Sequence, residues 1–120
     1  MLNLHEKYKR YKYRLDDGWD IAVKENPKDL PYYVTILCRF GEISLCDDEV
    51  LYVLAKNHKS IVTKLKTIEN AEIFCEGDDE IVFYIDLDCI KNVFRILKPL
   101  LNKKESEKVK ARFNTKQVRI

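Results

Sequence analysis

A pattern of acidic residues followed by an apolar run occurs twice, about thirty residues apart, and it constrains the fold more than any other feature of the chain. The first copy is CDDEVLYVLA, residues 46–55, and the second is EGDDEIVFYI, residues 76–85. A short β-prone stretch precedes the acids in both copies, EISLC at 42–46 and EIFCE at 72–76. Asp and Gly favour turns, whereas Val, Ile, Tyr and Phe favour strands. The sequence therefore predicts two β-hairpins with acidic tips.

A segment of helical period follows each predicted hairpin. Apolar residues recur three and four positions apart in HKSIVTKLKTI, 58–68, and again in LDCIKNVFRIL, 87–97. Pro99 is expected to end the second helix, because proline cannot continue the backbone bonding of a helix. The two units, 41–68 and 71–97, predict a ββα–ββα pseudo-repeat. We expect an α+β fold in which a mostly antiparallel sheet carries the helices on one face.

The segments before this centre are predicted to add strands to the sheet. YYVTILCRF, 32–40, is expected to be one strand. KYRLDDGWDIAV, 12–23, is expected to form two strands joined by a turn at DDG, 16–18. The segment 24–31 between them is expected to be a loop.

A chain of 120 residues is expected to form one domain over 1–120, with strands in 1–40, the two units in the centre and a basic tail or helix over 98–120. The net charge of +2 hides an uneven distribution. Residues 1–14 carry five basic and one acidic side chain, the last segment carries eight and two, and the part between them carries nine and seventeen. Such asymmetry is informative about partners rather than about fold.

Several classes of protein are disfavoured by the same composition. Charged residues interrupt every apolar run before it reaches the length of a membrane span, and the N-terminus lacks the apolar core of a secretory signal, so a cytoplasmic location is expected. The cysteines lack the paired spacing of a zinc site, and no metal or other cofactor is expected. In a reducing compartment they are expected to be small buried hydrophobic residues. They are Cys38, Cys46, Cys75 and Cys89.

No catalytic constellation is apparent, and we expect the protein not to be an enzyme. Neither His5 nor His58 has a neighbour that resembles part of a nucleophilic triad. Contiguous acids at a turn project in different directions, whereas a two-metal site needs carboxylates that converge from separate elements. The three glycines lie too far apart for a phosphate-binding loop.

The two basic ends of the chain are the candidate nucleic-acid-binding segments. HEKYKRYKYRL, 5–15, interleaves tyrosines with Lys and Arg, and such a mixture can neutralise phosphates and stack on exposed bases. The alternative for this segment is an edge strand whose tyrosines cover the core while its charged groups stay in water. In a helix over 102–113, Lys104, Lys108 and Arg112 would form one row. The predicted contact residues are Lys7, Tyr8, Lys9, Arg10, Tyr11, Lys12, Arg14, Lys103, Lys104, Lys108, Lys110, Arg112, Lys116 and Arg119.

These features predict a non-enzymatic module that binds DNA, RNA or a ribonucleoprotein. The alternative is a small protein-directed inhibitor or adaptor, for example one encoded by a phage and directed against a host nuclease or defence complex. In that alternative the two acidic tips lie on the same side of the sheet, are extended by Asp86 and Asp88, and occupy a basic groove of the partner. Its predicted contact residues are Asp47, Asp48, Glu49, Asp78, Asp79 and Glu80. A homodimer that forms through a sheet edge is a further possibility.

Overall fold

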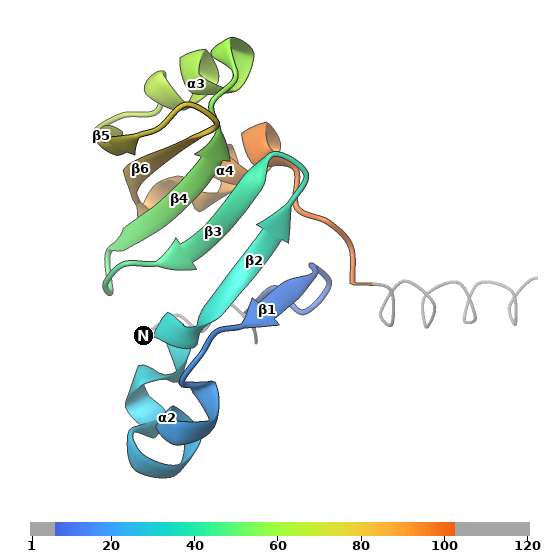
Figure 1. Cartoon of the computed structure of the whole chain (residues 1–120), viewed down its shortest axis with the longest axis vertical. Coiled ribbons are helices and arrows are strands. Elements are labelled where there is room, and N and C mark those ends of the chain that lie inside the picture. Colours follow the sequence, from blue (N-terminus) through green and yellow to red (C-terminus); the bar gives the residue numbers. More distant parts are fainter. Residues whose placement is uncertain (1–6, 103–120) are drawn as a thin grey trace, which may run out of the picture.

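The computed structural model describes residues 7–102, which contain a six-stranded antiparallel sheet with the strand order β1-β2-β3-β4-β6-β5 (Figure 1). Every pair of neighbouring strands is antiparallel. The strands are β1 (Tyr13–Leu15), β2 (Val34–Cys38), β3 (Gly41–Leu45), β4 (Val50–Lys56), β5 (Glu72–Glu76) and β6 (Glu80–Asp86).

The helices confirm the predicted α+β fold and its two ββα units. The α-helices are α2 (Trp19–Glu25), α3 (Lys59–Lys66) and α4 (Ile90–Leu97), and the 3-10 helices are η1 (Pro27–Tyr33) and η2 (Leu87–Cys89). The hairpin β3–β4 leads into α3, and the hairpin β5–β6 leads through η2 into α4. Figure 1 looks onto the sheet from the face opposite α4, so α4 is seen behind the strands. No helix in the described part of the chain is long and apolar enough to cross a membrane.

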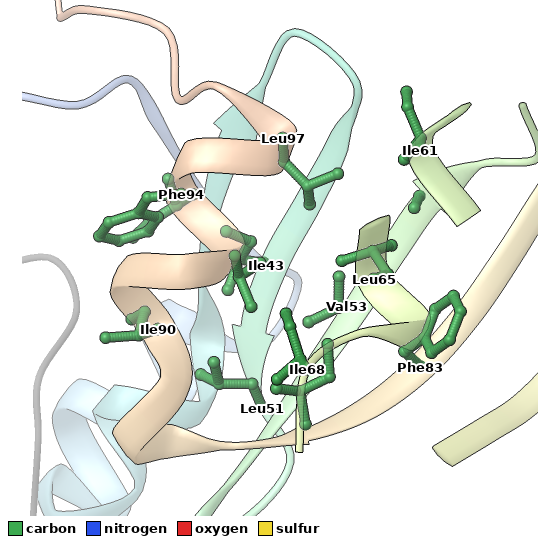
Figure 2. Packing of buried hydrophobic residues seen from close by; sticks show 14 of the residues in the cluster. Ile43, Leu51, Val53, Ile61, Leu65, Ile68, Phe83, Ile90, Phe94 and Leu97 are labelled. Atoms are coloured by element: carbon green, nitrogen blue, oxygen red, sulfur yellow. The ribbon is translucent and has the colours of Figure 1, made fainter. Parts of the chain in front are cut away.

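The core lies between the sheet and the helices α3 and α4 (Figure 2). Alternate residues of β4 and β6 point into it, because side chains of a strand alternate between the two faces of the sheet. Leu51 and Val53 of β4 and Phe83 of β6 are fully buried there. Leu65 of α3 and Leu97 of α4 are fully buried opposite them. Each such side chain contributes about 1.5 to 3 kcal/mol through burial, and together they hold the helix layer on the sheet.

The two acidic tips lie at opposite ends of the sheet, so the expectation that they share one side is wrong. The second strands of the two hairpins pair with each other, and this antiparallel pairing sets Val50 against Asp86 and Lys56 against Glu80. The tip before β4 therefore lies at the end where β6 finishes, while the tip before β6 lies at the end where β4 finishes. Asp86 joins the first tip only.

The expected second strand within 12–23 is wrong, because residues from Trp19 onward form the helix α2. Gly18 has a left-handed φ of 94°, and its carbonyl oxygen accepts a bond from the Ala22 N–H, which starts a helical turn. The strand is expected because the segment follows the turn signal at DDG, 16–18. Ile21 is 62% and Val23 is 47% exposed, so they supply no buried face for a strand.

Two further expectations are corrected. The segment after α2 is the 3-10 helix η1 rather than a loop, and β2 consequently begins at Val34 instead of at Tyr32. Cys46 and Cys75 are exposed, whereas Cys38 and Cys89 are half-buried, so burial as small hydrophobic residues does not hold for the first pair. Cys46 and Cys75 stand at strand ends or edges, where no helix covers them.

Candidate nucleic-acid interface

The last described residues are inserted between the first strand and the second. β1 pairs with β2 over three residues, and beyond Tyr13 the segment 98–102 enters between them. The Leu100 N–H donates to the Leu37 carbonyl oxygen at 3.0 Å, and the Lys12 N–H donates to the Leu100 carbonyl oxygen at 2.7 Å. The Asn102 N–H donates to the carbonyl oxygen of Arg10 at 2.8 Å. Figure 1 shows these two segments, far apart in sequence, side by side at the right of the sheet.

The tyrosines of the N-terminal segment pack against the core. Tyr8 meets Phe94 of α4 edge to face at a centroid distance of 5.0 Å, and Tyr11 meets the same ring at 5.2 Å. A turn makes both contacts possible, because the Tyr11 N–H donates to the Tyr8 carbonyl oxygen at 3.0 Å. Tyr13 also packs on the core. The rings therefore anchor the segment, as the edge-strand alternative predicts, and the charged groups are left at the surface.

The basic side chains of this segment differ in how far they are already neutralised. Arg14 bonds Asp16 at 3.1 Å and Glu42 at 2.9 Å, and these hydrogen bonds, that to Glu42 first, raise the pKa of its guanidinium. Lys7, Lys9 and Lys12 are exposed and form no ion pair with any residue in 7–102. Arg14 therefore has carboxylate partners, whereas the three lysines have none among residues 7–102.

Two basic residues that the sequence patterns missed lie beside this segment. Arg39 stands over the Phe40 ring at 5.2 Å and Lys98 stands over the same ring at 5.9 Å. The Arg39 N–H donates to the Lys98 carbonyl oxygen at 2.8 Å, which joins the β2–β3 turn to the end of α4. Single basic residues at the ends of apolar segments give no charge cluster in the sequence. We call the following set the basic surface: Lys7, Lys9, Arg10, Lys12, Arg39 and Lys98.

A basic cavity adjoins this surface and has a volume of about 230 Å³. Three ammonium groups, an aromatic ring, an imidazole and a hydroxyl belong to residues that line it, and Ile61 and Ile96 supply its apolar part. None of its described lining residues is acidic. The polar and aromatic lining residues are Phe40, Lys56, His58, Ser60, Lys64 and Lys98. We call this the Phe40 cavity.

A groove between α3 and α4 extends from the Phe40 cavity. It has a volume of about 380 Å³, shares Lys64 and Ile96 with the cavity and includes Arg95 and Glu69. Basic residues therefore continue from the basic surface, through the Phe40 cavity, over part of the helix layer.

The opposite end of the sheet is acidic. A cavity of about 360 Å³ is lined there by Asp48, Glu49, Asp86, Leu87 and Asp88. The Tyr32 hydroxyl donates to the Asp48 carboxylate at 2.7 Å, and this hydrogen bond is the main cause that raises the pKa of Tyr32 to about 12. No three His, Cys, Asp or Glu side chains within 7–102 are placed to hold a metal ion. We call the four carboxylates of this cavity, Asp48, Glu49, Asp86 and Asp88, the acidic end.

The predicted site residues are thus divided among three places. The described part of the predicted nucleic-acid set, from Lys7 to Arg14, forms one segment, in which Lys12 is bonded to Leu100 and Arg10 to Asn102. Asp48 and Glu49 lie at the acidic end, while Asp78, Asp79 and Glu80 lie near Lys56 at the other end of the sheet. The predicted contacts of the tail lie outside the described residues: Lys103, Lys104, Lys108, Lys110, Arg112, Lys116 and Arg119.

Comparisons with models of known families, with curated proteins and with solved structures gave no match. The function is therefore argued from the geometry and charge of this chain.

Proposed function

We propose that the protein is a non-catalytic module of the cytoplasm that binds nucleic acid, DNA or RNA, free or within a ribonucleoprotein, through its basic surface. The observation that carries the proposal is the insertion of 98–102 beside the N-terminal segment. It pairs Leu100 with Lys12 and Asn102 with Arg10, and the same segment begins at Lys98, which is bonded to Arg39. The basic N-terminal segment and the last described residues of the chain thereby lie side by side.

The charge of this surface suits phosphates. Lys7, Lys9 and Lys12 have no carboxylate partner among the described residues, so a phosphate has no protein anion to displace. Most of the free energy of such binding comes from the release of counterions that had been held by the nucleic acid. No side chain of this surface is placed in a rigid network that would read a base edge, and we therefore propose binding without sequence preference.

The acidic end would orient the bound strand. It lies at the far ends of β4 and β6 from Lys98 and would repel a polyanion there, while the other acidic tip, Asp78 to Glu80, would repel it beside Lys56. A nucleic acid would run across the edge that carries Lys12 and Lys98 and would avoid both acidic hairpin tips.

Fluorescence anisotropy with labelled single- and double-stranded DNA and RNA tests the proposal. The full chain should bind at low salt, with an affinity that falls steeply as salt rises. The double variant Lys9→Glu and Lys12→Glu should lower the slope of log affinity against log salt by about 2, one for each lost phosphate contact.

A matched control separates a specific surface from net charge. Lys24→Glu and Lys28→Glu change the charge by the same amount, and both residues are exposed on the connection between β1 and β2, toward the acidic end. The control should bind nearly as the wild type does. Absence of binding to all four ligands at low salt would reject the function, and equal weakening by both double variants would reject the basic surface as its site.

A second candidate function is supported by the acidic end. The cavity of about 360 Å³ gathers carboxylates from the first hairpin tip, β6 and η2, and a basic protein segment would complement it. This is the inhibitor or adaptor alternative, restricted to the one tip that Asp86 and Asp88 join.

Capture from cell extract with nuclease treatment separates the two candidates. Under the second candidate, a protein partner is retained after nuclease treatment and is lost with Glu49→Lys and Asp88→Lys. The same charge change at the other tip, Asp78→Lys and Asp79→Lys, should leave that partner bound. A partner that nuclease treatment releases would count against the acidic end.

A further inference from the structure

We infer that the Phe40 cavity binds a phosphate group, and that its ligand is a terminal phosphate monoester of the nucleic acid. The second half of this inference rests on the proposed function, whereas the first half does not. The cavity combines a cluster of positive charge, unpaired hydrogen-bond donors and a volume that suits a small group.

Charge is the first argument. Three lysines line the cavity and no carboxylate does. Each of the three ammonium groups attracts an anion that lies in the cavity, and this attraction offsets their mutual repulsion. A phosphate monoester carries close to two negative charges at neutral pH, whereas an internal diester carries one. The cavity should therefore favour a chain end over an internal position.

Some of the charged residues that line the Phe40 cavity also line a neighbouring cavity. Lys56 and His58 also line a neighbouring cavity that contains Asp78 and Asp79. Lys98 lines the Phe40 cavity and no other described cavity. Lys64 lines both the Phe40 cavity and the groove between α3 and α4, which contains one acidic residue, Glu69. Lys64 and Lys98 are for this reason the positions whose replacement tests the inference.

Hydrogen-bond donors are the second argument. Ser60 and Ile61 are the second and third residues of α3, and both line the cavity. N–H groups in the first turn of a helix have no carbonyl partner inside the helix. No side chain caps this end, since His58 occupies the N-cap position without a side-chain bond to the helix. These amides and the Ser60 hydroxyl are available to an anion, and the helix dipole favours one there.

Size and position are the third argument. A volume of about 230 Å³ is below the roughly 300 to 1,000 Å³ of sites that hold drug-sized molecules, so it suits a phosphate with part of a sugar. Lys98 belongs both to the cavity and to the basic surface. A nucleic-acid strand that follows the basic surface past Arg39 would bring its terminal phosphate to the Phe40 cavity.

Titration of the full chain with inorganic phosphate, followed by amide NMR, tests the cavity without a nucleic acid. The signals of Ser60 and Ile61 should shift in a saturable way, and chloride at equal ionic strength should not shift them. Lys64→Gln and Lys98→Gln should each weaken phosphate binding about tenfold, as expected for loss of a charge-assisted hydrogen bond. The controls Lys59→Gln and Lys66→Gln, on the same helix but outside the cavity lining, should weaken it much less.

Oligonucleotides of one sequence with 5′-phosphate, 3′-phosphate or hydroxyl ends then identify the source of the phosphate. At least one phosphorylated form should bind several times more tightly than the hydroxyl form, and Lys64→Gln should remove that difference while binding of the hydroxyl form persists. Phosphate binding with no preference for a phosphorylated end would overturn the assignment to a chain end.

Two outcomes distinguish the cavity from the proposed function. If phosphate shifts the Ser60 and Ile61 signals but no oligonucleotide binds, the cavity stands and the nucleic-acid function falls. If oligonucleotides bind irrespective of their ends and phosphate shifts neither signal, the function stands and the inference is overturned.

Discussion

The Tyr8 ring meets the Phe94 ring edge to face, at an interplanar angle of 88° and a centroid distance of 5.0 Å, so this aromatic residue of the basic N-terminal segment is a packing residue. Tyr11 makes the second contact to the same ring at 5.2 Å. The segment is consequently held on α4 by its aromatic side chains, while its lysines stay in solvent. The aromatic side chains therefore stabilise the segment, and the lysines supply its charge.

Replacement of Tyr8 tests this separation. Tyr8→Leu removes the edge-to-face pair and should lower the free energy of unfolding by about 1 kcal/mol. Tyr8→Phe keeps the ring and should change neither the free energy of unfolding nor the affinity for nucleic acid. Urea unfolding followed by circular dichroism gives the first quantity and anisotropy gives the second. A large loss of affinity in Tyr8→Phe, with unchanged stability, would show instead that the hydroxyl contacts the ligand.

Gly41 should not tolerate even a methyl group. A Cβ at this position would collide with the carbonyl oxygen of Leu54 on the paired strand β4. Gly41→Ala should therefore reduce the free energy of unfolding by at least about 2 kcal/mol, because the backbone of a central strand must move.

Gly77→Ala is the matched control for this effect. A Cβ at Gly77 would lie 3.3 Å from the Glu80 carbonyl oxygen at an exposed turn, which can shift more easily. Thermal unfolding of both variants compares them directly. Equal loss of stability would contradict the close approach at Gly41.

The cysteines should differ in their rate of alkylation. Burial, and secondarily the charge of Glu42, raises the pKa of the Cys38 thiol to about 12, so at pH 8 about one part in ten thousand is the reactive thiolate. Burial also raises the pKa of Cys89, whereas Cys46 and Cys75 are exposed. Mass spectrometry of the native protein during iodoacetamide treatment should show Cys46 and Cys75 modified first and Cys38 last. Modification of Cys38 as fast as that of Cys46 would contradict its packing against the core.

The hydrogen bond from Tyr32 to Asp48 should be visible in the titration of the phenol. Its pKa of about 12 lies above the usual 10, since the bond favours the protonated form in the folded protein. The contribution of this group to stability is therefore fully present below pH 10 and is lost as the pH rises through 12.

Absorbance of tyrosinate measures this prediction as the difference between the wild type and Tyr32→Phe. The difference curve should have its midpoint near 12, and in Asp48→Asn it should move down toward 10. A midpoint near 10 in the wild type would mean that the bond is absent in solution.

The hairpins could be predicted because turn residues and strand residues are neighbours in the sequence. The acids around Asp47 and Asp78 and the runs that follow them determine β3 to β6 without reference to distant residues. The helix α2 was missed because seven residues give too few turns for a period of 3.6 to stand out. The turn signal at DDG predicts a second strand, but Ile21 and Val23 are exposed and give that segment no buried face.

The candidate site could be predicted only in part for a related reason. The basic character of Lys7 to Arg14 is visible in the sequence, but its contact with Leu100 joins residues about ninety positions apart. No local preference encodes such a pairing. Arg39 precedes Phe40 in the sequence, whereas Lys98 and Lys64 come from a helix end and a helix, and only the fold brings these two lysines near Phe40.

The pairing of Leu100 with Lys12 and Leu37 also sets an order of events during synthesis. On a ribosome the first strand emerges long before the residues that complete its hydrogen bonds, and a long loop must close before that edge is finished. The central hairpins can assemble on the nascent chain, whereas the edge that carries the cationic side chains is assembled last. The affinity for nucleic acid that we propose should accordingly appear only after the central hairpins have formed.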